Sequence, residues 1–185
     1  MSHSKLTRHI PNFLTFINIS LGLGAIILLI RSNHPYKTLA ASILVVLGSF
    51  CDLFDGFLAR RFNVVTSMGK QLDSFADIVT FGIAPILLIN YTSQCKPPTF
   101  IVSASLIFVM AGTYRLARYN QHDFNENFVG LPITIAGIGL TFYCIVYPKW
   151  SIYVHDVICT AITILVIILL SFMMISKVKI RRIIT

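Results

Sequence analysis

The sequence predicts an all-helical, polytopic integral membrane protein with six transmembrane helices. Of its 185 residues, 56% are hydrophobic and only 12% are charged, whereas an ordinary soluble domain carries roughly a quarter charged residues. The mean hydropathy is +0.79. So few polar side chains cannot cover a water-facing surface, which excludes a soluble domain, a disordered tail and a fibrous repeat.

Six apolar runs follow one another along the chain, each near the roughly 20 residues that a helix needs to cross the hydrocarbon core. Pro11 enters the first run, at a position that favours proline. The connections are short and contain no linker or repeat, so we expect one domain over residues 1–185. The predicted spans are Asn12–Ile30, Leu39–Phe62, Gly69–Tyr91, Thr99–Asn120, Gly130–Tyr147 and Tyr153–Ile175.

The lysines and arginines predict the orientation, because cytoplasmic loops are rich in them. With the N-terminus inside, eleven of the fifteen lie in inner segments and four in outer loops. Both termini are then cytoplasmic, in the cell membrane, and the net charge of +8 reflects this orientation rather than a nucleic-acid partner. The inner residues are Lys5, Arg8, Arg60, Arg61, Lys70, Arg115, Arg118, Lys177, Lys179, Arg181 and Arg182; the outer ones are Arg31, Lys37, Lys96 and Lys149.

Four aspartates stand at the polar ends of the second and third runs. Asp52 and Asp55 are three residues apart, and Asp73 and Asp77 are four apart, so each pair shares one face of its helix. The two helices are antiparallel neighbours joined by a short turn. We therefore expect the four carboxylates to converge near the cytoplasmic surface.

Such a cluster needs a partner, since an ionised aspartate at the centre of a membrane helix costs about 2.5 to 3.5 kcal/mol. Oxygen-only ligands favour Mg²⁺, Mn²⁺ or Ca²⁺ over zinc or copper. Four carboxylates from two helices suit two such ions, as in two-metal phosphoryl-transfer sites. Protonation of some carboxylates would also relieve the cost, and interhelical hydrogen bonds or a solvated interfacial face are the alternatives to a metal site.

Small residues accompany the acids. Gly56, Ala59 and Gly69 share their helix faces and leave room for a flat ligand to approach the backbone. Close helix packing is the alternative explanation, because small residues are common at membrane helix contacts. Beside four carboxylates, a nucleotide-sized cavity is favoured.

The run from Asp52 to Asp77 resembles the signature of the CDP-alcohol phosphatidyltransferase family. Asp52-Leu-Phe-Asp55-Gly56-Phe-Leu-Ala59-Arg60 is followed after eight residues by Gly69, and then at intervals of four by Asp73 and Asp77. All eight signature positions match. The resemblance implies a six-span fold, a homodimer, a need for Mg²⁺ or Mn²⁺, and transfer of a phosphatidyl or similar group from a CDP-linked donor to an alcohol with release of CMP.

The same resemblance implies the roles of the site residues. Asp52, Asp55 and Asp73 would bind the metals, and Asp77 would complete that site and act as general base on the acceptor hydroxyl. Arg60 would contact the nucleotide or structure the turn. The remaining nucleotide-binding positions are Asn12, Thr15, Gly56, Ala59 and Gly69, the first two in a segment, Pro11 to Thr15, that resembles the family's first helix.

A second segment resembles the phosphatidylserine synthase branch of the family. It runs from Tyr114 to Asn120 and is followed by Phe128-Val-Gly130-Leu131-Pro132. Arg115 and Arg118 share a helix side, so one could bind a serine carboxylate and the other a lipid phosphate, with Asn120 beside them. Inner-leaflet anchoring is the alternative for the arginines, and a helix-start turn is the alternative for Gly130–Pro132.

The sequence therefore predicts that CDP-diacylglycerol and L-serine react on a metal site facing the cytoplasm, giving phosphatidylserine and CMP. Within the family, glycerol 3-phosphate, inositol phosphate or ethanolamine is the alternative acceptor. A small cation or proton transporter would spread its acids through the membrane depth, and a non-catalytic anchor or scaffold would have no use for eight fixed positions.

Overall fold

The computed structural model describes residues 3–62, 64, 66–92, 99–121 and 130–176, and for residues 3–11, 121 and 150 it describes the backbone alone. Every regular element in these ranges is helical. The elements are α1 (His3–Arg31), α2 (Lys37–Arg61), α3 (Ser67–Asp77), the π-helix η1 (Ile78–Ile83), α4 (Ala84–Thr92), α5 (Thr99–Gln121), α6 (Ile133–Trp150), the 3₁₀ turn η2 (Ser151–Tyr153) and α7 (Asp156–Ile175).

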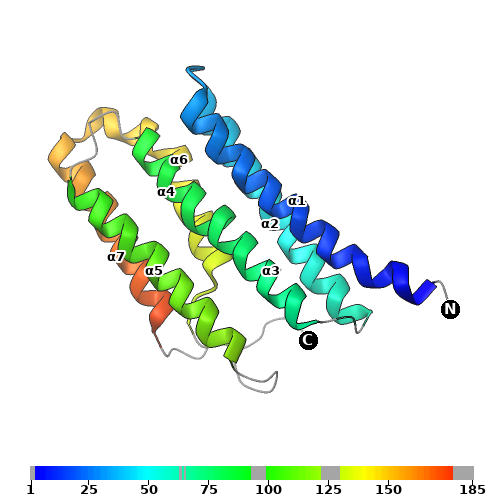
Figure 1. Cartoon of the computed structure of the whole chain (residues 1–185). Helices are drawn as coiled ribbons and strands as arrows, with labels where there is room; N and C mark the ends of the chain where they lie inside the picture. The colour runs from blue at the N-terminus through cyan, green and yellow to red at the C-terminus, as the bar shows by residue number, and fades with distance from the viewer. Residues whose placement is uncertain (1–2, 63, 65, 93–98, 122–129, 177–185) are drawn as a thin grey trace.

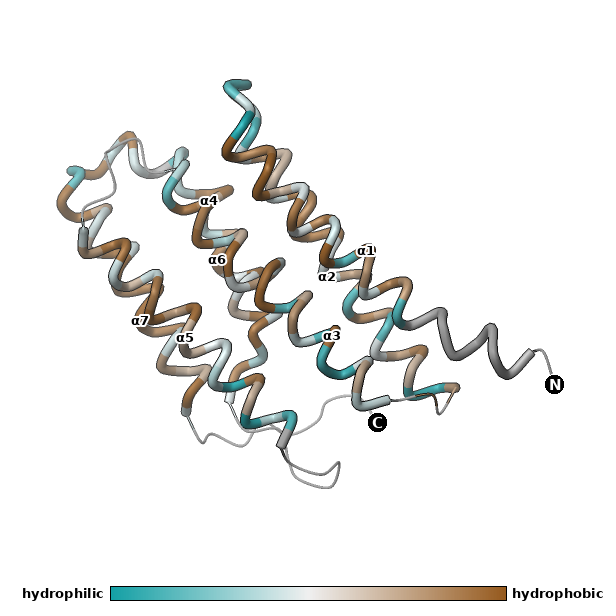
Figure 2. Tube along the Cα trace, in the orientation of Figure 1, coloured by the Kyte–Doolittle hydropathy of each residue, from teal (hydrophilic) through white to brown (hydrophobic). Residues whose placement is uncertain are grey.

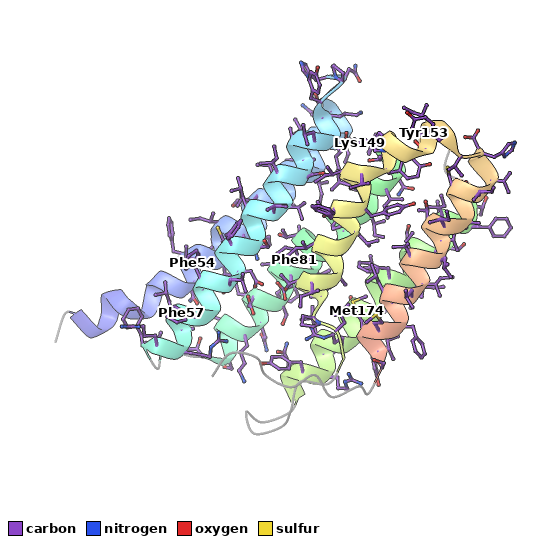
Figure 3. All side chains as sticks on the ribbon, turned by 180° about the vertical axis from the view of Figure 1, so that it is seen from behind. Phe54, Phe57, Phe81, Lys149, Tyr153 and Met174 are labelled. Carbon is purple, nitrogen blue, oxygen red and sulfur yellow. The ribbon has the colours of Figure 1, made fainter. Side chains whose placement is uncertain are left out.

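The helices form two outer pairs around a central layer. In Figure 1, α1 and α2 run antiparallel along one side, α5 and α7 along the other, and the continuous rod α3–η1–α4 lies between them with α6. The fully buried side chains Phe81, Phe108 and Leu140 come from this central layer and from α5. Phe81 lies in the middle of the bundle in Figure 3.

Five stretches are long and apolar enough to cross a membrane, which confirms an all-helical polytopic membrane protein. They are Asn12–Arg31, Lys37–Arg61, Ser67–Thr92, Thr99–Asn120 and Asp156–Ile175. The remaining apolar helix, Ile133–Lys149, is shorter, so the sixth span stays a prediction. In Figure 2 the middle of the bundle is mainly hydrophobic and the polar residues gather toward the helix ends.

Many large apolar side chains face outward, as lipid contact requires. Phe54 and Phe57 of α2 are 57% and 50% exposed, and Figure 3 shows both projecting away from the other helices. Both lie on sides of α2 other than the one that carries the buried Asp55. The helix thus presents one side to the hydrocarbon and another to the bundle.

The first predicted span agrees with the structure, where the apolar stretch Asn12–Arg31 lies within a helix that begins at His3. Two other predicted starts are each three residues too early. The fifth begins at Ile133 rather than Gly130, because Gly130 has a φ of +84° and Pro132 is the residue before the first helical turn. The sixth begins at Asp156 rather than Tyr153, since η2 comes first and the His155 side chain accepts a hydrogen bond from the backbone N–H of Val157.

Several residues used in the sequence analysis have side chains outside the described part of the structure. Their contributions to orientation, anchoring and the second resemblance stay predictions. These residues are Lys5, Arg8, Pro11, Lys96, Phe128, Lys177, Lys179, Arg181 and Arg182.

The π-helix η1 directly follows Asp77 and packs closely against α1 and α2. Thr80 is fully buried, and its hydroxyl donates a 3.1 Å hydrogen bond to the backbone carbonyl of Asn18. A Cβ atom at Gly22 would overlap the Thr80 hydroxyl and lie 2.9 Å from its Cα; at Gly48 it would lie 2.8 Å from the Thr80 methyl. Only glycine permits this approach.

Replacing Gly22 with alanine should therefore destabilise the bundle by about 1 to 3 kcal/mol, the usual cost of overpacking a close contact. Thr80 must move, and η1 with it. Thermal unfolding in detergent measures the effect. Gly24→Ala is the matched control on the same helix, because its new Cβ would meet only a Leu44 methyl at 3.7 Å. Equal melting temperatures for the two variants would contradict this account.

Candidate metal and nucleotide site

The site lies near one end of the bundle, where Arg61 closes α2 and Ser67 opens α3; we call this the aspartate end. Asp52 is nine residues before the end of α2, and Asp77 is ten residues after the start of α3. At 1.5 Å per residue, both lie about 15 Å inside the helix ends. The acids are thus set two to three turns into the bundle.

Local capping fixes the face that α3 presents. Thr66 has extended backbone angles, and its hydroxyl accepts a 3.0 Å hydrogen bond from the backbone N–H of Gly69, as expected of a helix N-cap. Gly69, Asp73 and Asp77 then follow at intervals of four along the helix. At the end of α2, the Ala59 carbonyl accepts from the backbone N–H of Val64 at 3.1 Å, which turns the chain back toward α3.

The four aspartates converge as the sequence predicts. Asp52, Asp55 and Asp73 each direct a carboxylate oxygen into one group, with those oxygens all within 4.8 Å of one another. Asp77 joins them from one turn deeper on α3, and its carboxyl group lies within hydrogen-bonding reach of Asp52. Asp55 is 4% exposed and Asp77 is 7% exposed, so the cluster is largely shielded from water.

Two threonine hydroxyls approach the cluster from other helices. Thr15 of α1 donates a 2.7 Å hydrogen bond to Oδ2 of Asp55, and Thr134 of α6 donates a 3.1 Å bond to Oδ2 of Asp52. Thr15 was expected to contact the nucleotide, and here it holds an aspartate. Thr134 was not anticipated at all, because it lies 82 positions from its partner and no local pattern marks it.

The donor set fits a divalent cation. The three residues of the candidate group offer carboxylate oxygens, which Mg²⁺ and Mn²⁺ prefer. Among the described residues, Oδ1 of Asp73 and Oδ1 of Asp77 are buried without a hydrogen-bond partner. Buried carboxylate oxygens are costly unless they are paired or coordinate a metal, so a cation among them would resolve both.

The predicted nucleotide-side residues lie on the same helical stretches as the acids or next to them. Asn12 reaches Gly69, where a Cβ atom would lie 3.3 Å from the Asn12 Oδ1. The Arg60 guanidinium folds back over Gly56, and a Cβ there would meet only Arg60, at 3.6 Å. Its charge also acts on Asp55 and Asp73. Ala59 lies half-buried one turn beyond Asp55.

The two arginines of α5 have different partners. Arg115 is only 6% exposed, its charge interacts with Asp77, and its Nε has no hydrogen-bond partner among the described residues. Arg118 instead donates a 3.4 Å bond to the carbonyl of Ile175 at the end of α7. Asn120 donates to the Ser74 hydroxyl at 2.9 Å, on the exposed side of α3. Arg115 therefore lies close to the acids, as Arg60 does.

The Gly130–Pro132 step joins α6 to the end of α7. The backbone N–H of Leu131 donates a 3.0 Å hydrogen bond to the Met173 carbonyl, and a Cβ at Gly130 would overlap the Met174 carbonyl. Figure 3 shows Met174 at this end of α7, close to the start of α6. The step therefore forms the turn that leads into α6.

The chain is similar in sequence to known proteins over most of its length. The sequence model of the CDP-alcohol phosphatidyltransferase family matches residues 8–174. The chain is 34% identical over 172 residues to the CDP-diacylglycerol–serine O-phosphatidyltransferase of Bacillus subtilis (strain 168), an overlap of 92% of this chain and 89% of that relative.

Other relatives match over shorter stretches. The protein of the same name from Methanocaldococcus jannaschii is 34% identical over 137 residues, which cover 73% of this chain and 60% of that relative. The CDP-diacylglycerol–glycerol-3-phosphate 3-phosphatidyltransferase of Rickettsia bellii (strain RML369-C) is 36% identical over 100 residues, covering 54% and 55%. The similar proteins thus include two acceptor classes.

Proposed function

The chain belongs to the CDP-alcohol phosphatidyltransferase family, and from that membership we propose that it transfers the phosphatidyl group of CDP-diacylglycerol to the hydroxyl of L-serine. The observation that carries the proposal is the convergence of Asp52, Asp55 and Asp73, from two antiparallel helices, on one small space. The products are phosphatidylserine and CMP.

The site faces the cytoplasm in this proposal. Arg60, Arg61, Lys70, Arg115 and Arg118 all belong to the aspartate end of the bundle, and cytoplasmic ends are rich in such residues. Both termini are then cytoplasmic if α6 crosses the membrane. The diacylglycerol chains stay in the bilayer while the nucleotide and serine enter from water. The homodimer implied by the family resemblance stays a prediction.

Asp52, Asp55, Asp73 and Asp77 would hold the divalent ions, two of Mg²⁺ or Mn²⁺. Such ions neutralise charge on a diphosphate and on the departing CMP. Thr15 and Thr134 keep the side chains of Asp55 and Asp52 in place through their hydroxyl groups. Shielding of the cluster from water strengthens every charge interaction within it.

Cytidine binding is assigned to the side of the cluster where Gly56, Ala59 and Gly69 lie. Gly56 and Gly69 lack side chains there, and Ala59 adds only a methyl group. Arg60 reaches the same space and can pair with a phosphate, since its guanidinium presents several donors in a plane. Asn12 offers an amide beside Gly69.

Asp77 is assigned as the general base. It takes the proton of the serine hydroxyl while that oxygen forms a bond to the phosphorus that carries diacylglycerol. The bond from this phosphorus to the CMP oxygen breaks, and CMP leaves with the electron pair. A base must lie within hydrogen-bond reach of the proton that it removes, and Asp77 lies deepest in the cluster, beside Arg115.

Arg115 is the best-supported acceptor residue. Its buried guanidinium interacts with Asp77 and has an unpartnered Nε, so a serine carboxylate could bind it in a bidentate manner next to the base. Arg118 and Asn120 bond to Ile175 and Ser74, which supports helix-capping and interhelical roles at least as well as contact with the acceptor or a lipid phosphate.

An acceptor screen tests the proposal. Purified protein with CDP-diacylglycerol and Mn²⁺ should release CMP with serine and form phosphatidylserine, and should do so little with glycerol 3-phosphate, inositol phosphate or ethanolamine. Mass spectrometry of the lipid product identifies the acceptor. Exclusive use of glycerol 3-phosphate, the acceptor named for the Rickettsia relative, would refute serine while keeping the family.

Arg115→Gln provides the control within the same assay. It should raise the KM for serine and leave the KM for CDP-diacylglycerol unchanged, because the lost interaction is with the acceptor alone.

A flux assay tests the alternative from another class. Cation flux into vesicles that contain the protein, without any CMP release, would favour a transporter over a transferase.

A further inference from the structure

We propose that Thr134 is a positioning residue for Asp52, through which the first turn of α6 sets the geometry of the aspartate cluster. The inference rests on the proposed metal-dependent function. Its basis is the 3.1 Å hydrogen bond from the Thr134 hydroxyl to Oδ2 of Asp52. The two residues are 82 positions apart in sequence and belong to different helices.

Asp52 is the member of the cluster whose orientation matters most. Its carboxyl group approaches both Asp73 and Asp77, and it shares the candidate metal group with Asp55 and Asp73. A rotation of this side chain would therefore disturb every other acid. The Thr134 hydroxyl engages one of its two oxygens and restricts that rotation.

The first turn of α6 is held in place by contacts with the end of α7, so the position of Thr134 on that turn is fixed. The Leu131 backbone N–H bonds the Met173 carbonyl, and Gly130 packs against the backbone at Met174. Arg118 bonds the carbonyl of Ile175, at the same end of α7. Thr134 follows directly on this anchored turn, so its hydroxyl is delivered to Asp52 in a fixed place.

Asp55 has a matching arrangement on the other side. Thr15 of α1 donates to Oδ2 of Asp55 at 2.7 Å. Each aspartate of α2 is thus held by one threonine hydroxyl from a different neighbouring helix. Groups that hydrogen-bond a metal-binding carboxylate typically change metal affinity or activity by about 10- to 100-fold when they are removed.

Three variants test the inference: Thr134→Val, which keeps the shape and removes the hydroxyl; Thr134→Ser, which keeps the hydroxyl; and Thr141→Val as control. Thr141 is fully buried on the same helix, and its hydroxyl donates a 2.8 Å hydrogen bond to the Gly137 carbonyl of that helix rather than to an aspartate. The first readout is Mn²⁺ affinity in detergent without substrates, measured by electron paramagnetic resonance. The second is the separation of kcat from the two KM values.

Thr134→Val should weaken Mn²⁺ binding about 10- to 100-fold and lower kcat at subsaturating Mn²⁺, with little change in the KM for serine. Thr134→Ser should restore wild-type affinity, and Thr141→Val should not alter it. Equal Mn²⁺ affinity in wild type and Thr134→Val, or equal losses in Thr134→Val and Thr141→Val, would reduce Thr134 to a packing residue. Failure of the wild type itself to bind Mn²⁺ would overturn the metal part of the proposed function, and this inference with it.

Discussion

Replacing Asp77 with asparagine should lower the kcat for serine-dependent CMP release by about 10²- to 10⁴-fold, the range that general-base catalysis contributes. Asparagine has nearly the same shape, but its amide cannot take the proton of the serine hydroxyl. Asp77 is 7% exposed and sits beneath the other three acids, so water cannot readily replace it. Release of CMP under saturating substrates measures the loss.

Asp156→Asn is the matched control for that variant. Asp156 lies in the first turn of α7, at the end of the bundle remote from the cluster, and its replacement should leave kcat within about twofold of wild type, as expected of a group outside the reacting site. Size-exclusion profiles in detergent establish that both variants fold. A well-folded Asp77→Asn variant with wild-type turnover would remove Asp77 from the role of base.

Removal of divalent ions should reduce CMP release to background, and addition of Mg²⁺ or Mn²⁺ should restore it. The physical reason is that carboxylate oxygens of Asp52, Asp55 and Asp73 lie within 4.8 Å of one another. These negative charges would repel an anionic diphosphate unless a cation between them neutralised both. Activity is measured against free metal concentration after chelation.

The Asp55→Asn variant tests whether the negative charge of Asp55 contributes to metal binding. It retains the shape and a carbonyl oxygen for the Thr15 hydroxyl but removes one negative charge, so half-maximal activity should need at least about tenfold more metal. Thr160→Val serves as the control, because Thr160 lies on α7 near the far end of the bundle. Full activity of the wild type in excess chelator would exclude a divalent ion from the reaction.

The aspartate cluster was predictable from the sequence because helical periodicity is strict over short distances. Spacings of three and four residues place Asp52 with Asp55 and Asp73 with Asp77 on common faces. The short turn between the two helices makes them antiparallel neighbours, so these faces can lie against each other. The five long spans were predictable for a similar reason, since hydrocarbon thickness fixes their length.

Contacts between distant helices were not predictable in the same way. Thr134 meets Asp52 only because Gly130 turns the chain and α7 anchors that turn, and neither event leaves a local pattern at Thr134. The two arginines show the same limit. Spacing places Arg115 and Arg118 on one side of α5, and it does not reveal that the charge of Arg115 interacts with Asp77 of α3 while Arg118 bonds the end of α7.

The π-helix η1 has a consequence for how the third span is divided. A π turn accommodates one residue more than an α turn, so side chains beyond Ile83 are rotated by about 100° relative to an uninterrupted α-helix. The half before it can direct acids toward α2, while the half after it presents Ala84, Leu88 and Thr92 to the interior. One membrane-crossing rod therefore carries two differently phased surfaces, one with the aspartates of α3 and one with the buried apolar residues of α4.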